Sequence, residues 1–327
     1  MKRLFTKLIP FWAMLTPMCC TLTSCSDTTS SINIIGLDDF HGCVMQYHNN
    51  DLYEERIKTM ADTFITEKNK NPDNTYFILL GDNTDDSGIC QFTNEKAGCD
   101  VLKSFHPKYS AVGNHEIKSK YNTNYYECLD PDNDDSFVNA LGLKCYLCCN
   151  AYWYDGATTE FCDYFQPYAI EHIGGLNVGF VGYTTAKLPE PEKEVKKRTL
   201  FCADATNDEE KFFNTGKTGV EILQDAIDAC HNDSLNLNNG TEPDVVILVQ
   251  HEGAFRNGTE QWQKEGSYQV VGHINGIDAS MEGHSHINYN MVFPDKDGKE
   301  IPACQGGAFA TYLSNLQITY NKSKPNI

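Results

Sequence analysis

Four apolar segments of this chain run directly into short motifs of Asp, Asn and His. The segments, residues 32–37, 76–80, 109–112 and 244–249, are short and apolar, as buried strands are. The motifs that follow are Asp39-Phe40-His41, Gly81-Asp82-Asn83, Gly113-Asn114-His115-Glu116 and Gln250-His251-Glu252. In layered α/β folds, binding sites gather beyond the carboxyl ends of the strands. We therefore expect these motifs, far apart in sequence, to meet at one site.

A fifth motif, Gly283-His284-Ser285-His286, completes a set of metal-binding side chains. The candidate ligands are two Asp, one Asn and four His: Asp39, Asp82, Asn114, His41, His251, His284 and His286. Such a set can hold two divalent cations side by side, bridged by one carboxylate. Two cations in that arrangement activate a water and neutralise a phosphate in the same step. The motifs thus predict a metal-dependent phosphoester hydrolase.

The types of ligand narrow the identity of the metals to a few transition metals. Oxygen and imidazole ligands without thiolate suit Zn²⁺, Mn²⁺, Fe or Co²⁺ and do not choose among these metals. Asp38 competes with Asp39 for the ligand role. Residues two apart on an extended segment face the same way, so the spacing from Asp39 to His41 favours Asp39.

Other segments alternate between the helical and the strand pattern. Residues 51–70 and 217–230 carry apolar side chains at helical spacing, and residues 177–183 form a further apolar run. Residues 309–320 are expected to contribute one or two closing strands. This alternation predicts an α/β fold of packed layers.

Charge and composition exclude some function classes. Of the 327 residues, 40% are hydrophobic, which is enough for a sizeable core and too many for a disordered chain. The formal net charge of −19 argues against a nucleic acid polymer as partner, because sequence-independent binding needs a basic surface. An acidic protein also repels phosphate, so bound cations would have to offset that repulsion locally.

The first 25 residues resemble an export signal. Lys2, Arg3 and Lys7 form a charged start, and residues 8–22 are largely apolar but short for a membrane span. Residues 22–25 resemble a lipobox, in which Cys25 would be acylated and would anchor the protein to a membrane. An ordinary cleaved secretory peptide explains the pattern equally well. We expect a linker at 26–31 and one domain over 32–327, exported to the cell envelope or secreted.

The cysteines favour disulfides in an exported chain. Of the 14 Cys, three lie in or beside the leader, and the odd number that remains leaves at least one free thiol unless Cys25 pairs. Cys90 and Cys99 flank a short loop that they could bridge. Cys145 and Cys148 have the spacing of a zinc or redox motif but no second pair, so we expect them to be structural.

Together the five motifs resemble those of the calcineurin-like metallophosphoesterases, and most closely the N-terminal catalytic domain of 5′-nucleotidases. The resemblance continues through residues 149–153, 166–170, 178–185, 305–307 and 312–316, and so covers nearly all of residues 32–327. It implies a four-layer α/β/β/α sandwich. It also implies that the C-terminal domain of 5′-nucleotidases, which grips the nucleobase, is absent.

The resemblance assigns a role to each candidate residue. It implies that Asp39, His41 and His286 bind one metal, that Asn114, His251 and His284 bind the other, and that Asp82 bridges them. It further implies that His115 stabilises the transition state and protonates the leaving group. The family usually places an Asp where this chain has Lys118, and that Asp orients the catalytic His. The substitution either lowers activity or leaves the orienting role to Asp85 or Asp86.

These inferences predict an exported two-metal phosphomonoesterase that acts on small phosphorylated substrates, nucleotides among them. One alternative is a phosphodiesterase for 2′,3′-cyclic nucleotides, or an activity like that of the UDP-sugar hydrolases. An alternative of another class is a non-catalytic surface protein that keeps the fold. The oligomeric state cannot be inferred from the sequence.

Overall fold

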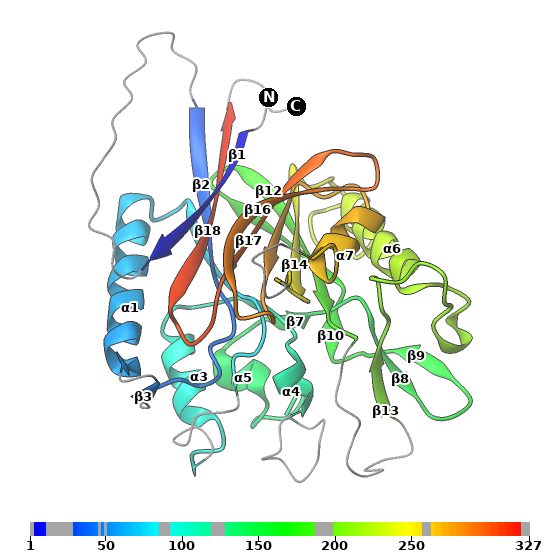
Figure 1. Ribbon diagram of the computed structural model, residues 1–327, viewed down its shortest axis with the longest axis horizontal. Coiled ribbons are helices and arrows are strands. Elements are labelled where there is room, and N and C mark those ends of the chain that lie inside the picture. Colours follow the sequence, from blue (N-terminus) through cyan, green and yellow to red (C-terminus); the bar gives the residue numbers. More distant parts are fainter. Residues whose placement is uncertain are drawn as a thin grey trace.

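In the computed structural model, two β-sheets form the centre of the protein (Figure 1). The structure describes residues 3–10, 29–44, 47–48, 51–84, 92–118, 128–186, 199–256 and 263–321. The first sheet has seven strands, in the order β1 (Arg3–Pro10), β18 (Tyr312–Asn321), β2 (Thr29–Leu37), β5 (Thr75–Leu79), β6 (Tyr109–Ala111), β7 (Cys145–Leu147) and β10 (Phe165–Gln166). The second has six, in the order β11 (Tyr168–Ile173), β12 (Leu176–Thr184), β14 (Val245–His251), β15 (Ala279–Glu282), β17 (Glu300–Gly306) and β16 (Asn288–Pro294).

The central strands of both sheets are parallel. In the first sheet β2, β5, β6 and β7 run in one direction, and in the second sheet β12, β14, β15 and β17 do. Two smaller sheets lie beside them: β13 (Thr199–Cys202), β8 (Ala151–Tyr154) and β9 (Thr159–Phe161) form one, and β3 (Tyr47–His48) and β4 (Asp51–Leu52) form the other. Parallel neighbours end at the same edge of a sheet, so the loops that follow them lie close together.

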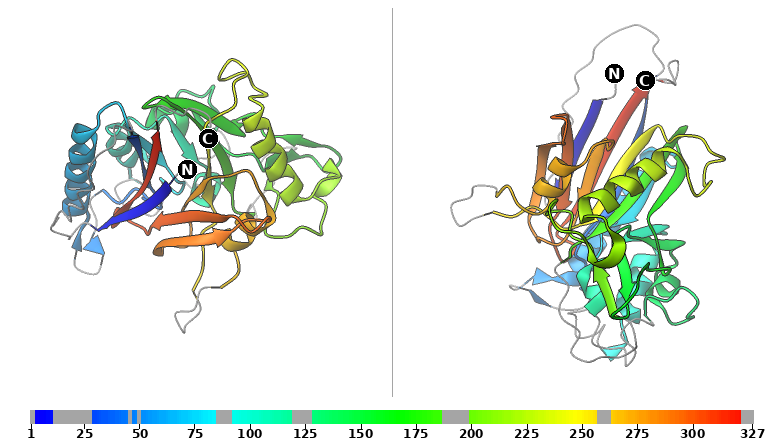
Figure 2. Two further views of the ribbon diagram at one scale, coloured as in Figure 1. Left: turned by 90° about the horizontal axis from the view of Figure 1, so that it is seen from above. Right: turned by 90° about the vertical axis from the view of Figure 1, so that its right-hand side faces the viewer.

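Helices cover the outer faces of the two sheets, which makes the protein the predicted four-layer α/β/β/α sandwich (Figures 1 and 2). The helices on the first sheet are α1 (Tyr53–Lys70), α3 (Lys96–Lys103) and α5 (Phe137–Leu141). Those on the second are α6 (Gly219–His231) and α7 (Ser267–His273). The short α4 (Asn114–Lys118) follows β6, and a 3₁₀ turn covers Phe213–Thr215.

Three apolar clusters fill the spaces between the layers, because successive side chains of a strand point to opposite faces. In β14, Val245, Ile247 and Val249 pack between the two sheets. Val246 and Leu248 of the same strand pack against the α6 and α7 layer. A strand that is buried on both faces must be apolar throughout, which explains the uninterrupted apolar runs in the sequence.

The predicted elements are confirmed with small shifts at their ends. Residues 51–70 form α1 from Tyr53, and residues 217–230 form α6 from Gly219, where Thr218 and Glu221 cap each other's backbone N–H groups. Strand β2 begins at Thr29, inside the expected linker, because its first residues pair with the end of β18. Residues 309–320 give a single strand, β18, which begins only at Tyr312.

Part of the expected leader is described. Residues 3–10 form β1, which pairs antiparallel with β18. Residues 11–28, which include Cys25, lie outside the described residues, so the leader and its processing stay predictions. Among the helices that the structure describes, none is both long and apolar enough to span a bilayer.

The cysteines in the described part of the chain are buried, and several of them carry free thiols. These are Cys145, Cys148, Cys149, Cys202, Cys230 and Cys304. Cys145 lies in β7, and Cys148 follows that strand directly. Cys90 lies outside the described residues, so its bridge to Cys99 stays a prediction.

Candidate metal centre

All five motifs lie at the ends of parallel strands. Asp39 and His41 follow β2, Asp82 follows β5, and Asn114 begins the helix after β6. From the second sheet, His251 ends β14, and the motif with His284 and His286 follows β15. The strand before this last motif was not predicted, because its sequence, Ala279-Ser280-Met281-Glu282, lacks an apolar run.

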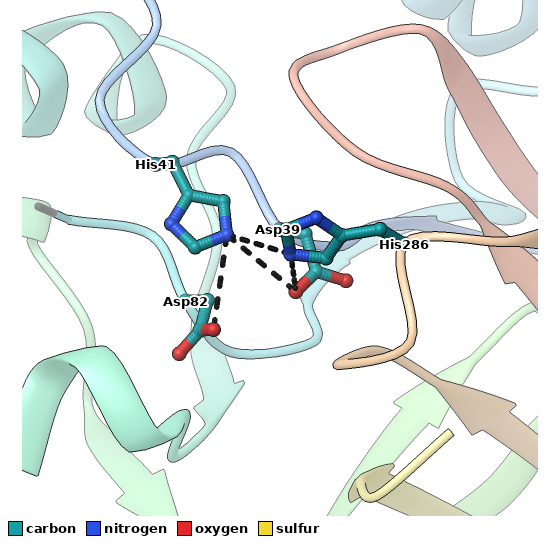
Figure 3. Close-up of side chains that lie close together, drawn as sticks. All are labelled: Asp39, His41, Asp82 and His286. Carbon is teal, nitrogen blue, oxygen red and sulfur yellow. Dashed lines mark hydrogen bonds and ion pairs between the residues drawn. The ribbon is translucent and has the colours of Figure 1, made fainter. Parts of the chain in front are cut away.

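The first group of candidate ligands contains Asp39, His41, Asp82 and His286, whose side chains converge in Figure 3. His41 Nε2 lies 3.0 Å from His286 Nε2, 3.8 Å from Asp39 Oδ1 and 3.8 Å from Asp82 Oδ2. His286 Nε2 lies 3.3 Å from Asp39 Oδ1. Two imidazole nitrogens and two carboxylate oxygens therefore surround one small volume.

The second group contains Asp82, His251 and His284, so Asp82 belongs to both groups. Its Oδ2 lies 3.1 Å from His251 Nε2, and the ring centroids of His251 and His284 are 5.2 Å apart. Asn114 precedes His115, whose backbone N–H donates to Asp82 Oδ1 at 2.8 Å. The structure thus brings six of the seven candidate ligands together, and Asn114 lies next to His115 beside them.

Positive φ angles mark this place as strained. Five of the candidate ligands adopt φ values that L-residues rarely take: Asp39 (48°), His41 (50°), Asp82 (50°), His284 (86°) and His286 (57°). Each such conformation costs free energy and persists only where the surrounding structure imposes it. Their concentration in three loops is typical of a functional site.

The electrostatics of the site centre on the buried carboxylates. Burial alone would raise the pKa of Asp82, but His251, His41 and His115 around it hold that pKa well below its usual range. Burial opposes the charged form of His251, yet Asp82 and Asp39 raise its pKa to about 10. The pKa of His284 falls to about 4 because of burial and the neighbouring His251. The carboxylates therefore attract positive charge, and a dication would displace the proton of His251.

The donor set fits two divalent cations. Asn114 Oδ1 is buried and has no hydrogen-bond partner among the described residues, which costs free energy unless a cation or water satisfies it. The other candidate donors are carboxylate oxygens and imidazole nitrogens, which Zn²⁺ and similar metals bind. The Asp/His cluster is therefore compatible with a binuclear metal site, whose metals the residues do not identify.

Asp38, the competitor of Asp39, points elsewhere. Its Oδ1 accepts a hydrogen bond from the backbone N–H of Gly306 at 2.9 Å, at the end of β17. Asp39 instead accepts from the backbone N–H of His284 at 2.9 Å. Asp39 thus faces the cluster, as the spacing indicated, while Asp38 joins β2 to the second sheet.

His115 lies at the rim of the cluster. Its side chain is 16% exposed, its Nε2 lies 3.9 Å from Asp82 Oδ2, and its ring centroid lies 4.6 Å from that of His41. The side chain of Lys118, and Asp85 and Asp86 as whole residues, lie outside the described part of the chain. Which group orients His115 therefore stays a prediction.

Sequence reasoning assigned no role to Glu116, whose side chain links two of the loops that carry candidate ligands. Its Oε2 accepts backbone N–H bonds from Gly113 at 2.8 Å and Asp82 at 2.9 Å, and its Oε1 accepts from Asn83 at 2.6 Å. Burial and the nearby Asp82 raise the pKa of Glu116 to about 7. One carboxylate thus fixes the loops after β5 and β6 relative to each other.

Glu116→Gln is expected to lower metal affinity and turnover by about 10- to 100-fold, as replacements of supporting groups behind metal ligands do. The amide nitrogen of Gln cannot accept the N–H bonds that one carboxylate oxygen accepts now. Metal titration and turnover of a phosphomonoester measure the effect. Glu242→Gln, at an exposed position, is the control. Unchanged metal affinity in the Glu116 variant would contradict the supporting role.

A second buried carboxylate, Glu282, ties together the strands that carry His251 and His284. Its Oε1 accepts hydrogen bonds from Ser280 Oγ at 2.6 Å and Gln250 Nε2 at 3.1 Å, and Tyr289 donates its hydroxyl to Oε2. The Tyr289 hydroxyl accepts in turn from the backbone N–H of Ala254 at 3.0 Å. The network joins the ends of β14 and β15 and the start of β16 behind the cluster.

Phe309 covers the other side of the cluster. Its ring centroid lies 5.3 Å from that of His41 and 5.5 Å from that of His286, and its backbone N–H donates to Asp39 O at 2.8 Å. Arg56 of α1 donates to Phe309 O at 3.3 Å. Phe309 has a φ of 56°, which explains why β18 starts later than predicted.

The sandwich and the Asp/His cluster at its strand ends define a class of protein, the metal-dependent phosphoester hydrolases. The chain belongs to the calcineurin-like phosphoesterase family, whose family model matches residues 34–288. That range contains all five motifs, so the family resemblance drawn from them is confirmed. No curated protein matches the sequence.

Solved structures share the fold. Haemophilus influenzae NAD nucleotidase (NadN) matches with a TM-score of 0.59 and 14% identity over 90% of this chain and 48% of that chain. A putative 5′-nucleotidase from Staphylococcus aureus gives 0.57 and 18% over 88% and 51%. The calcineurin-like phosphoesterase YfkN from Bacillus subtilis gives 0.55 and 16% over 88% and 85%. This chain spans about half the length of the first two.

Proposed function

We propose that this protein is a two-metal phosphoester hydrolase that cleaves small phosphomonoesters, nucleotides among them. The observation that carries the proposal is the position of Asp82. Its Oδ2 lies 3.8 Å from His41 Nε2 in one group of candidate ligands and 3.1 Å from His251 Nε2 in the other. A carboxylate between two such groups can bridge two cations.

In this proposal each group of side chains holds one ion. Asp39, His41 and His286 hold the first, Asn114, His251 and His284 hold the second, and Asp82 holds both. When bound, the two ions neutralise a phosphate and lower the pKa of a water. They are Zn²⁺, Mn²⁺, Fe or Co²⁺. The supporting residues Glu116 and Glu282 keep the ligands at their distances before substrate arrives.

His115 is the proposed acid. Its Nε2 lies 3.9 Å from Asp82 Oδ2, it belongs to neither ligand group and its side chain is 16% exposed, so its imidazole can reach an oxygen of a bound phosphoester. At neutral pH a histidine side chain can stabilise negative charge on that oxygen, or donate a proton to the leaving group when it is protonated. Asp82 contributes by accepting the backbone N–H of His115, which fixes the start of α4.

The substrate class is inferred from two observations. The fold is shared with a NAD nucleotidase and a putative 5′-nucleotidase, and the protein carries a formal net charge of −19. The shared fold favours nucleotides as substrates, and the negative net charge disfavours nucleic acid polymers. We also propose export through a leader at residues 1–25, with Cys25 as the site of a lipid anchor if the leader is of the lipoprotein type.

Removal of metal is expected to abolish turnover. The purified protein should contain about two divalent ions per chain, and a chelator should stop hydrolysis of a chromogenic phosphomonoester until metal is restored. Elemental analysis and the assay with and without chelator measure this. A panel of AMP, a UDP-sugar and a 2′,3′-cyclic nucleotide then separates the phosphomonoesterase from its alternatives. Two bound metals without turnover of any of these would instead establish a non-catalytic protein that keeps the fold.

A further inference from the structure

Three cysteines lie together in the part of the core that joins the first sheet to the three-stranded sheet. Cys148 follows β7, Cys162 follows β9, and Cys202 ends β13. All three belong to the same apolar cluster, with exposures of 0%, 0% and 7%. They come from segments far apart in the sequence, and the proposed hydrolase chemistry uses none of them.

The strand register excludes one of the possible pairs. Cys202 pairs with Ala151 of the middle strand, β8, and Cys162 donates its backbone N–H to Ala151 O at 2.9 Å from the other side. Cys162 and Cys202 are therefore separated by two strand spacings, about 9.6 Å. A disulfide requires Cα atoms within about 7 Å of each other, so these two cannot be joined.

Two pairs remain, Cys148 with Cys162 and Cys148 with Cys202, and the contacts of Asn150 favour the second. The Cys148 thiol lies close enough to the Cys202 thiol to raise its pKa, together with burial. The Cys148 thiol also donates to Asn150 Oδ1 at 3.2 Å. Asn150 in turn binds Ala203 through two hydrogen bonds, since its backbone O accepts from Ala203 N at 2.8 Å and its Nδ2 donates to Ala203 O at 2.9 Å. These bonds hold the segments that carry the two thiols side by side.

We propose that Cys148 and Cys202 form a disulfide bond when the protein folds in an oxidising environment. The oxidant is a small disulfide such as oxidised glutathione. The Cys202 thiolate attacks one of its sulfurs and releases one glutathione thiolate, which leaves a mixed disulfide. The Cys148 thiolate then attacks the Cys202 sulfur and releases the second glutathione. The protein loses two protons and two electrons, and oxidised glutathione becomes two molecules of reduced glutathione.

The bond would join β13 to the segment after β7, which hydrogen bonds connect to His251. Asn150, between the two cysteine segments, donates through Nδ2 to Thr184 O at 2.7 Å, at the end of β12. The next residue, Thr185, donates its backbone N–H to His251 O at 2.9 Å. The disulfide therefore constrains the unfolded chain between residues 148 and 202. In the folded protein it would hold in place the segment whose hydrogen bonds lead to His251, one of the candidate ligands.

The test is peptide mapping of the full chain after refolding with reduced and oxidised glutathione, with remaining thiols blocked by iodoacetamide. We expect one peptide pair linked through Cys148 and Cys202, with a mass about 2 Da below the sum of the two reduced peptides. Reduction should lower the melting temperature by about 5 °C or more. A link from either cysteine to Cys162, or full alkylation of both, would overturn the proposal.

Cysteine variants distinguish the effect of the Cys148–Cys202 disulfide on stability from the effect of removing any buried thiol. Cys148→Ser and Cys202→Ser are each expected to abolish the shift in melting temperature on reduction. Cys230→Ser removes a buried thiol of α6 in a different apolar cluster and should keep that shift. A shift that survives in both Cys148→Ser and Cys202→Ser would count against the proposal. The peptide map of the unchanged protein gives its result even if a variant fails to fold, and metal content has no part in it.

Discussion

Asp82→Asn is expected to lower phosphomonoester turnover by about 10³-fold, a loss of ~4 kcal/mol in transition-state stabilisation. The replacement keeps the shape of the side chain, and its remaining oxygen can still accept the backbone N–H of His115. It removes the negative charge and the second oxygen, so a single side chain no longer serves both groups of ligands. Turnover with saturating metal, together with elemental analysis, measures the loss.

The matched control is His172→Ala. His172 is exposed and binds Asn177 Oδ1 at 3.1 Å, on a hairpin that carries no candidate ligand. Its removal should leave turnover within about twofold, as for surface substitutions in general. If the Asp82 and His172 variants were equally active, Asp82 would not be a bridging ligand, and the proposed two-metal function would be wrong.

The sequence predicted the strands and the candidate ligands because both depend on local patterns. A strand buried on both faces must be apolar throughout, and β14 shows this from Val245 to Val249. The motifs after such strands were recognisable because parallel strands bring their carboxyl ends to one edge. Successive side chains of a strand point to opposite faces of the sheet, so such a strand contributes to two different cores. A sheet built from these strands must therefore be covered by a layer on each face.

The supporting residues could not be predicted in this way. Glu116 joins two loops by accepting the N–H groups of Asp82 and Asn83, more than 30 positions away. The bond between Tyr289 and Glu282 depends on how β15 and β16 are arranged around β17. Phe309 reaches His41 because its backbone adopts a positive φ, a conformation that an apolar run gives no reason to expect. The one local signal was the unexplained Glu at the end of the Gly-Asn-His-Glu motif.

Gly113→Ala is expected to destroy the metal centre. Its φ lies outside the left-handed region, so alanine is compatible with the backbone and the effect is steric. A Cβ at this position would lie 2.1 Å from both Asp82 N and Asp82 Oδ1 and 2.7 Å from Glu116 Oε2. Backbone and two buried, hydrogen-bonded carboxylates cannot move aside as a flexible side chain would. We expect a destabilisation of about 3 kcal/mol and the loss of at least one bound metal.

Gly272→Ala provides the control, because that glycine lies in α7 and its added Cβ would meet only Pro294 O, at 3.8 Å. Alanine is the better helix former by about 1 kcal/mol, so this variant should be neutral or more stable. Thermal unfolding and elemental analysis of both variants separate the clash from the general cost of adding a methyl group. A Gly113→Ala protein with full metal content and unchanged stability would mean that Asp82, Gly113 and Glu116 do not pack as the structure shows. In that case Asp82 could not be held between the two groups of ligands by these contacts.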